Sequence, residues 1–84
     1  MTLPKIINRP VKVWTDEAGR PLAFLFRRRR HPVACVLEVW EELDHWWEAP
    51  LERTVYRLET AAGGLYELEF RRPEGRWYLY KAYD

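Results

Sequence analysis

Residues 53–84, RTVYRLETAAGGLYELEFRRPEGRWYLYKAYD, have the pattern of three antiparallel strands joined by two short turns. In the middle strand three apolar residues alternate with two glutamates: Tyr66, Leu68 and Phe70 with Glu67 and Glu69. This alternation has the period of a strand with one buried face, so both glutamates are expected on an ordinary solvent face. Residues 61–64 and 73–75 supply the glycines of hairpin turns. Residues 77–83 are apolar on both faces, which is typical of a central or barrel-closing strand.

The N-terminal half shows the same kind of pattern. Residues 10–26 predict a hairpin whose turn lies at residues 16–19, with Gly19 as the left-handed position. The following strand is expected to place four residues on one face: Val33, Cys35, Leu37 and Val39. At the C-terminal end of this strand, near residues 40–47, a short helical turn is the alternative, because the apolar residues there also fit a helical period.

These elements predict an all-β fold, a small antiparallel barrel or sandwich of about six strands. With 84 residues the chain has room for a single domain, residues 1–84, and residues 1–9 are expected as an extended N-terminal arm. The aromatic content of 15% argues against disorder. Exposed strand edges on such a small sheet also make a homodimer compatible with the sequence.

Composition limits the classes of function. A net charge of +1 excludes a global polycation, so any affinity for nucleic acid must come from local charge. The N-terminus has no long apolar segment of the signal-peptide type, and no apolar run approaches the roughly 20 residues of a spanning helix. A cytoplasmic protein without a membrane partner is therefore expected. The absence of Ser and Gln, together with many Glu and Arg, is typical of a protein from a hot habitat.

Catalytic patterns are weak. A serine nucleophile is excluded because the chain has no Ser. Cys35, with Asp44 and His45, has the residue types of a thiol triad, but its apolar neighbours favour a buried and inert thiol. His31 and His45 lack the spacing of metal ligands, and no glycine-rich phosphate loop is present. We expect no catalytic residues, no metal, no cofactor and no enzymatic activity; a small uncharacterised enzyme is the weakest alternative.

Two features favour binding functions. The segment HWWEAP, residues 45–50, places adjacent tryptophans among acidic residues, which disfavours phosphate and favours a protein partner. The predicted partner-binding surface is the rim around Trp46 and Trp47, with Glu48 and the nearby Arg53. The second feature is the run of four arginines at residues 27–30, where a hairpin turn is expected.

The arginine run supports an alternative, a nucleic-acid-binding module. Phosphate binding requires several guanidinium groups that reach one backbone together. The candidate residues are Arg27, Arg28, Arg29, Arg30, Arg71, Arg72 and Arg76. The last three, at the other basic hairpin, can contribute only if both turns lie at the same end of the barrel. Otherwise the run is a solvated hairpin tip.

A family resemblance covers nearly the whole chain, from about residue 10 to residue 84. The matching positions are Phe26, Arg27, Arg29, Val33, Val36, Leu37, Trp40, Trp46, Trp47, Arg53, Tyr56, Gly64, Trp77, Tyr78, Leu79, Tyr83 and Asp84. In these the chain resembles a small bacterial domain of unknown function that also occurs at the C-terminal end of Y-family-polymerase-like ImuB proteins of the mutasome. It departs at Arg28, where the family has a turn glycine, and at Val55, where it has tyrosine. The resemblance implies a non-catalytic interaction module, protein-binding and associated with DNA replication, repair or damage tolerance.

Overall fold

The computed structural model describes residues 3–45 and 50–83. They form seven strands, in chain order β1 (Pro4–Pro10), β2 (Val13–Thr15), β3 (Pro21–Phe26), β4 (Arg29–His45), β5 (Pro50–Thr60), β6 (Leu65–Arg71) and β7 (Arg76–Tyr83). The described part of the chain contains no helix, which confirms the all-β fold. The helical turn near residues 40–47 is wrong for Trp40–His45, which continue β4 in regular pairing with β5; residues 46 and 47 lie outside the described residues.

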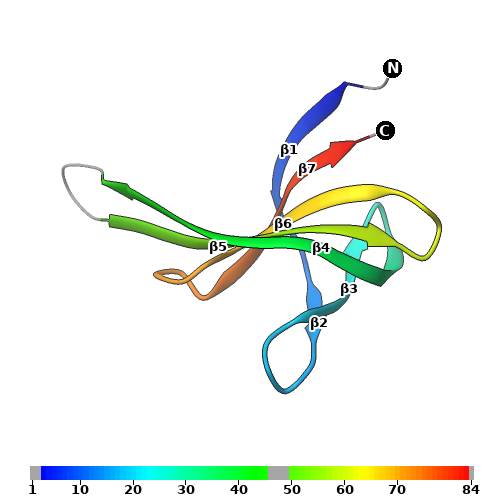
Figure 1. The fold of residues 1–84 in the computed structure, drawn as a ribbon, viewed down its shortest axis with the longest axis horizontal. Coiled ribbons are helices and arrows are strands. Elements are labelled where there is room, and N and C mark those ends of the chain that lie inside the picture. The colour runs from blue at the N-terminus through cyan, green and yellow to red at the C-terminus, as the bar shows by residue number, and fades with distance from the viewer. Residues whose placement is uncertain (1–2, 46–49, 84) are drawn as a thin grey trace.

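One antiparallel sheet, curled into a half-barrel, has the strand order β1-β7-β6-β5-β4-β3-β2 (Figure 1). Its two edge strands, β1 and β2, follow each other in the chain. At the junction the Val11 N–H donates to the Trp77 carbonyl of β7 at 3.1 Å, and the Lys12 carbonyl accepts from the Leu25 N–H of β3 at 2.9 Å. One N-terminal segment therefore joins both edges of the sheet. Counted as one strand, it reduces seven strands to the expected six. Residues 4–9, expected as an arm, pair with β7.

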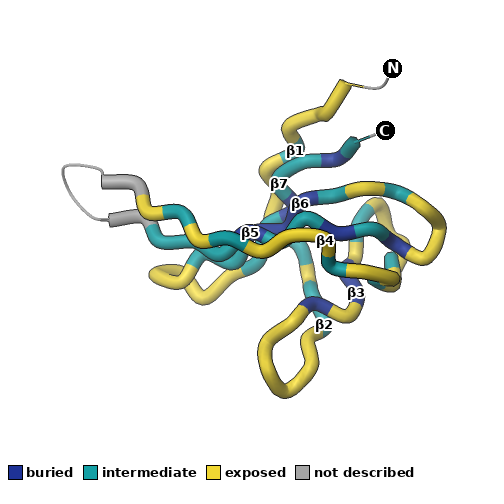
Figure 2. The backbone as a smooth tube through the Cα atoms, in the orientation of Figure 1, coloured by how far each residue is buried: buried dark blue, intermediate teal, exposed yellow. Residues whose placement is uncertain are grey.

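The core lies on the inner face of the curl, where the tube of Figure 2 shows the buried stretches of β3, β5, β6 and β7. Four fully buried side chains form its centre: Phe24, Leu58, Leu68 and Leu79. They come from four different strands, so each strand contributes one apolar face to the same cluster. Gly19 and Gly75 adopt the positive φ expected of turn glycines, 84° and 63°.

Strand β4 does not follow the simple alternation of its sequence. The register with β5 shifts between Val33 and Cys35 and again between Val36 and Glu38, so β4 carries two bulges. Each bulge inserts one residue and reverses the facing of those that follow. As a result Cys35 turns away from the face of Val33 and is exposed, and Leu37, the extra residue of the second bulge, is 48% exposed. Val39, beyond both bulges, returns to the face of Val33 and lies opposite Tyr56, where it is 54% exposed. The prediction of one shared face is therefore wrong for Cys35 and Leu37 but holds for Val33 and Val39, and the prediction of a buried Cys35 is wrong.

The opposite face of the central strands carries ion pairs, and the two glutamates of β6 are buried in them. Glu67 and Glu69 are 3% and 1% exposed. Glu67 accepts a hydrogen bond from the Tyr83 hydroxyl and pairs with Arg57 at 3.3 Å. Glu69 pairs with Arg53 at 3.4 Å and with Arg71 at 2.9 Å. The expectation that both glutamates face solvent is wrong, because long arginine side chains cover them: Arg53 and Arg57 from the neighbouring strand β5, and Arg71 from the end of β6 itself.

Two further contacts extend these ion pairs to β4. Arg53 donates to Glu42 at 2.9 Å, and Arg57 to Glu38 at 2.8 Å. The Trp40 indole N–H donates to Glu42 at 2.9 Å, and this hydrogen bond, with a smaller contribution from Arg53, lowers the pKa of Glu42. We call this set of alternating charges on β4, β5 and β6 the charge ladder.

Candidate functional site

An aromatic trough opens at one end of the half-barrel, between the β2–β3 hairpin and the β6–β7 turn. Its floor consists of Tyr56, Phe70 and Trp77; the Trp77 ring centroid lies 5.4 Å from Tyr56 and 5.1 Å from Phe70. Three adjoining depressions, of about 510, 310 and 170 Å³, make up the trough. The first two share Trp77 and the last two share Tyr56. The inner face of β5, β6 and β7 thus continues from the core into an open surface.

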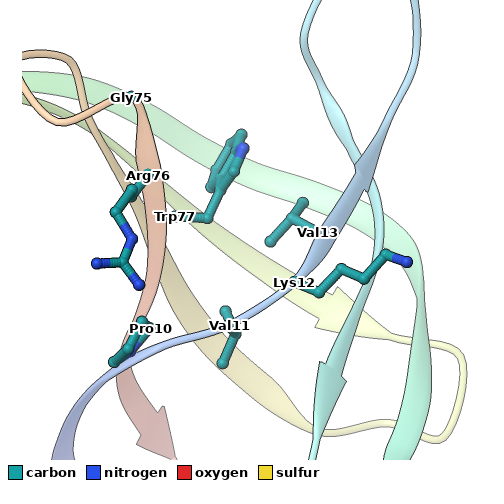
Figure 3. Close-up of a pocket in the computed structure, with 7 residues that line it drawn as sticks. All are labelled: Pro10, Val11, Lys12, Val13, Gly75, Arg76 and Trp77. Carbon is teal, nitrogen blue, oxygen red and sulfur yellow. The ribbon is translucent and has the colours of Figure 1, made fainter.

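The largest depression lies where the N-terminal segment leaves β7. Figure 3 shows the indole of Trp77 and the side chain of Val13 facing each other across this gap, whereas Lys12 and Arg76 point away from it. Val11 is still hydrogen-bonded to β7, but two residues later the chain is paired only with β3. The gap exists because β7 begins at Arg76, so the chain beyond Val11 has no β7 residue opposite it. The residue before β7, Gly75, belongs to the β6–β7 turn and has positive φ.

The backbone of Val13 forms the wall of this gap. Lys12 and Leu25 lie opposite each other and are hydrogen-bonded, so Val13, the next residue, directs its N–H and C=O away from β3. Among the described residues, no backbone group on the β7 side pairs with Val13. A short open strand edge therefore borders an aromatic floor.

The other end of the trough is apolar and exposed. Leu37 and Val39 line its smallest depression, next to Tyr56 and Arg20. Burial raises the pKa of the Tyr56 hydroxyl, with a smaller opposing effect from Arg20. The trough thus combines apolar side chains, a neutral phenol and an open backbone edge.

Of the predicted partner-binding residues, Trp46, Trp47 and Glu48 lie outside the described residues. Arg53 is described, and its side chain belongs to the charge ladder, where it contacts Glu42 and Glu69. It faces the side of β5 opposite to Tyr56, because the two differ by an odd number of positions along a regular strand. Arg53 is therefore not part of the trough. No sequence pattern indicated the trough, since it depends on where β2 and β7 part.

The four arginines lie at the other end of the half-barrel, as the hairpin tip that the sequence predicted. Phe26 pairs with Arg29, which leaves Arg27 and Arg28 as a two-residue turn with φ of 53° and 63°. Both residues occupy the left-handed region that favours glycine and asparagine. The Arg30 guanidinium lies 4.7 Å from the centroid of Trp14, and that of Arg27 lies 5.1 Å from Phe26.

A depression of about 330 Å³ adjoins this tip, and we call it the basic pocket. It is lined by Lys5, Ile7, Phe26, Arg27, Arg29, His31, Tyr66 and Ala82. Strand β1 brings Lys5 to the site through its pairing with Ala82 of β7. The His31 ring stacks on Phe24 at 5.1 Å and lies within hydrogen-bonding distance, 3.2 Å, of the Phe26 carbonyl. His31 is therefore a wall of the basic pocket held by two neighbours.

The second basic hairpin does not join the first. Arg71 and Arg76 pair at the start of β7, whereas the basic pocket lies beside the end of β7, at Ala82. The two turns lie at opposite ends of the sheet (Figure 1). Arg72 is also paired, with Glu41 at 2.9 Å and Glu52 at 3.4 Å. The single patch that combined Arg71, Arg72 and Arg76 with the run at residues 27–30 is therefore not formed.

Other site types find no support in the part of the chain that the structure covers. Residues 3–45 and 50–83 contain no group of three or more His, Cys, Asp or Glu side chains placed to hold a metal ion. Within the same residues no helix is long and apolar enough to cross a membrane.

The family comparison covers the whole sheet but assigns no activity to it. The model of the family described as "Domain of unknown function (DUF6504)" matches residues 3–84. Searches of the curated proteins and of the solved structures returned no significant match. Because the match spans almost all of its residues, the chain belongs to the DUF6504 family of domains of unknown function.

Proposed function

We propose that this domain is a non-catalytic interaction module that holds an extended segment of a partner protein in the aromatic trough. The observation that carries the proposal is the open edge of β2 at Val13, which directs one N–H and one C=O into a depression floored by Trp77. A polypeptide strand is the ligand that satisfies such an edge, because it brings an alternating row of donors and acceptors.

The trough adds side-chain recognition to this backbone pairing. Alternate side chains of an added strand point to the same face, and here that face is the aromatic floor. Burial of one large apolar side chain between Val13 and Trp77 contributes about 1.5–3 kcal/mol. The partner segment is therefore extended and has apolar residues at alternate positions. Leu37 and Val39, about half exposed, offer a second apolar contact further along.

The class of partner follows from the resemblance to the C-terminal domain of ImuB proteins. On that basis the partner is a cytoplasmic protein engaged in DNA replication, repair or damage tolerance. Trp46 and Trp47, which the sequence predicts to bind a partner protein, lie outside the described residues and stay part of this proposal on the sequence alone.

The test uses a library of displayed random peptides, with the domain as bait. We expect the enriched peptides to have apolar residues at alternate positions. When the backbone amides of such a peptide are N-methylated one at a time, binding should be lost at every second amide only. Hydrogen exchange of the Val13 amide should slow on binding. Val39→Asp places a charge in the trough and should weaken binding, whereas the matched change Leu65→Asp, at a 36% exposed strand residue outside the trough, should not.

The proposal fails if the selected peptides show no alternation, or if N-methylation is tolerated at every position. Equal losses of affinity in the Val39 and Leu65 variants would also contradict it.

A further inference from the structure

We propose that the basic pocket binds single-stranded nucleic acid, with phosphates on Lys5, Arg27 and Arg29 and a base against its aromatic wall. This site lies at the end of the half-barrel opposite the aromatic trough and does not depend on the peptide-binding proposal. It also differs from the patch predicted from sequence, because Lys5 replaces the arginines of the β6–β7 turn.

The first argument is the difference between two sets of arginines. Four of them, Arg53, Arg57, Arg71 and Arg72, form ion pairs with carboxylates. In the described part of the chain, the arginines of residues 27–30 and Lys5 have no carboxylate within ion-pair distance. An anion that binds at the tip therefore does not have to displace a carboxylate of the domain.

The second argument is that three separate elements bring cations to one hollow. Arg27 comes from the turn, Arg29 from the start of β4, and Lys5 from β1. Because Phe26 pairs with Arg29 in a two-residue turn, the hairpin geometry fixes both arginines beside the pocket. Arg28 lies in the same turn but does not line the pocket. Convergence of this kind distinguishes a built site from a diffuse run of charge.

The third argument is the aromatic wall, which favours a single strand. Phe26, His31 and Tyr66 line the same hollow as the cations. Single-strand binders combine a positive groove with aromatic side chains on which unpaired bases stack. A duplex keeps its bases stacked inside and cannot use such a wall. A phosphate-bearing lipid surface offers charge but no base, so it is the alternative that the experiment must separate.

The experiment is fluorescence anisotropy with a labelled oligothymidylate, the same sequence as a duplex, and vesicles that contain phosphatidylserine. With three phosphates neutralised, the logarithmic salt slope is about −2, so affinity should fall about 20-fold between 50 and 200 mM salt. The single strand should bind more tightly than the duplex, and binding to the vesicles should be weaker still.

Two matched pairs of variants locate the site. Arg27→Asn and Arg28→Gly remove one charge each from the same turn, and both introduce residues that tolerate positive φ. Arg27→Asn should reduce the salt slope by about 0.7, whereas Arg28→Gly should leave it unchanged. Arg29→Gln should act like Arg27→Asn, and Arg9→Gln, an exposed residue on β1 away from the pocket, should leave affinity within twofold of the parent.

Each outcome decides the proposal. It is overturned if no single strand binds at 50 mM salt, if duplex or vesicles bind as well as the single strand, or if all four variants weaken binding equally. The last result would mean diffuse charge without a pocket. Because the turn variants are not expected to unfold the domain, a lost affinity reports on contacts and not on folding.

Discussion

The burial of Glu69 in the charge ladder predicts a large loss of stability from a change of one atom. Glu69→Gln keeps the size of the side chain but removes the negative charge between Arg53 and Arg71. Breaking a buried ion pair by removing one partner costs about 3–5 kcal/mol, because a charge stays behind without compensation. We expect a loss of stability near the lower limit of this range, because both arginines keep another partner: Arg53 keeps Glu42, and Arg71 keeps Asn8.

A loss of about 3 kcal/mol is large for a domain of this size. For 84 residues the entropy of unfolding is about 0.18 kcal/mol/K, so Tm should fall by about 17 °C. The control is Glu41→Gln, which breaks another Glu–Arg pair of the same length. The pairs Glu69–Arg71 and Glu41–Arg72 both measure 2.9 Å, but the two glutamate side chains are 2% and 70% exposed. An exposed pair contributes about 0–1 kcal/mol.

The assay is thermal and urea unfolding followed by tryptophan fluorescence, with the three proteins compared at the same concentration and pH. The decisive quantity is the difference between the two variants, because residue type and shortest pair distance are matched whereas burial differs. Glu69 differs also in its second arginine partner, Arg53, at 3.4 Å. If Glu41→Gln lowers Tm as much as Glu69→Gln, burial does not determine the strength of these pairs and the reasoning is refuted.

Three other outcomes are expected. Arg28→Gly should stabilise the domain by about 1 kcal/mol, measured by urea unfolding, because φ of 63° costs an L-residue more than glycine. Trp40→Phe removes the main cause of the lowered pKa of Glu42, so that pKa should rise towards 4.5 in an NMR titration. The stability from ionised Glu42, present above about pH 4.5 and lost as the pH falls through its folded pKa, should shrink. Cys35, being exposed, should react with a thiol reagent in the native protein, whereas a slow reaction limited by unfolding would contradict its exposure.

The turns and the core of the second half were predictable from sequence, because each depends on local chemistry. Gly19 and Gly75 adopt the positive φ for which glycine is suited, and Leu58 and Leu68 lie where alternation places them. Strand β7 is apolar on both faces and does lie between two neighbours, β1 and β6.

The failures have a common physical cause, which is that a neighbour far away in sequence decides the outcome. Glu69 has the pattern of a solvent-facing residue, yet Arg53 of β5, together with Arg71 of its own strand, covers it. Cys35 leaves its predicted face because a bulge against β5 inserts a residue. Lys5 enters the basic pocket only because β1 pairs with β7.

The continuous path of β1 into β2 has a consequence for how the chain reaches its native state during synthesis. Strand β1 is synthesised before β2 to β6, and its partner β7 only after them. Until β7 has left the ribosome, β1 remains unpaired, while β3, β4, β5 and β6 can each pair with the strand made just before. Closure of so distant a contact is slow relative to hairpin formation. The N-terminal segment is thus the part of the nascent domain most exposed to mispairing and to chaperones.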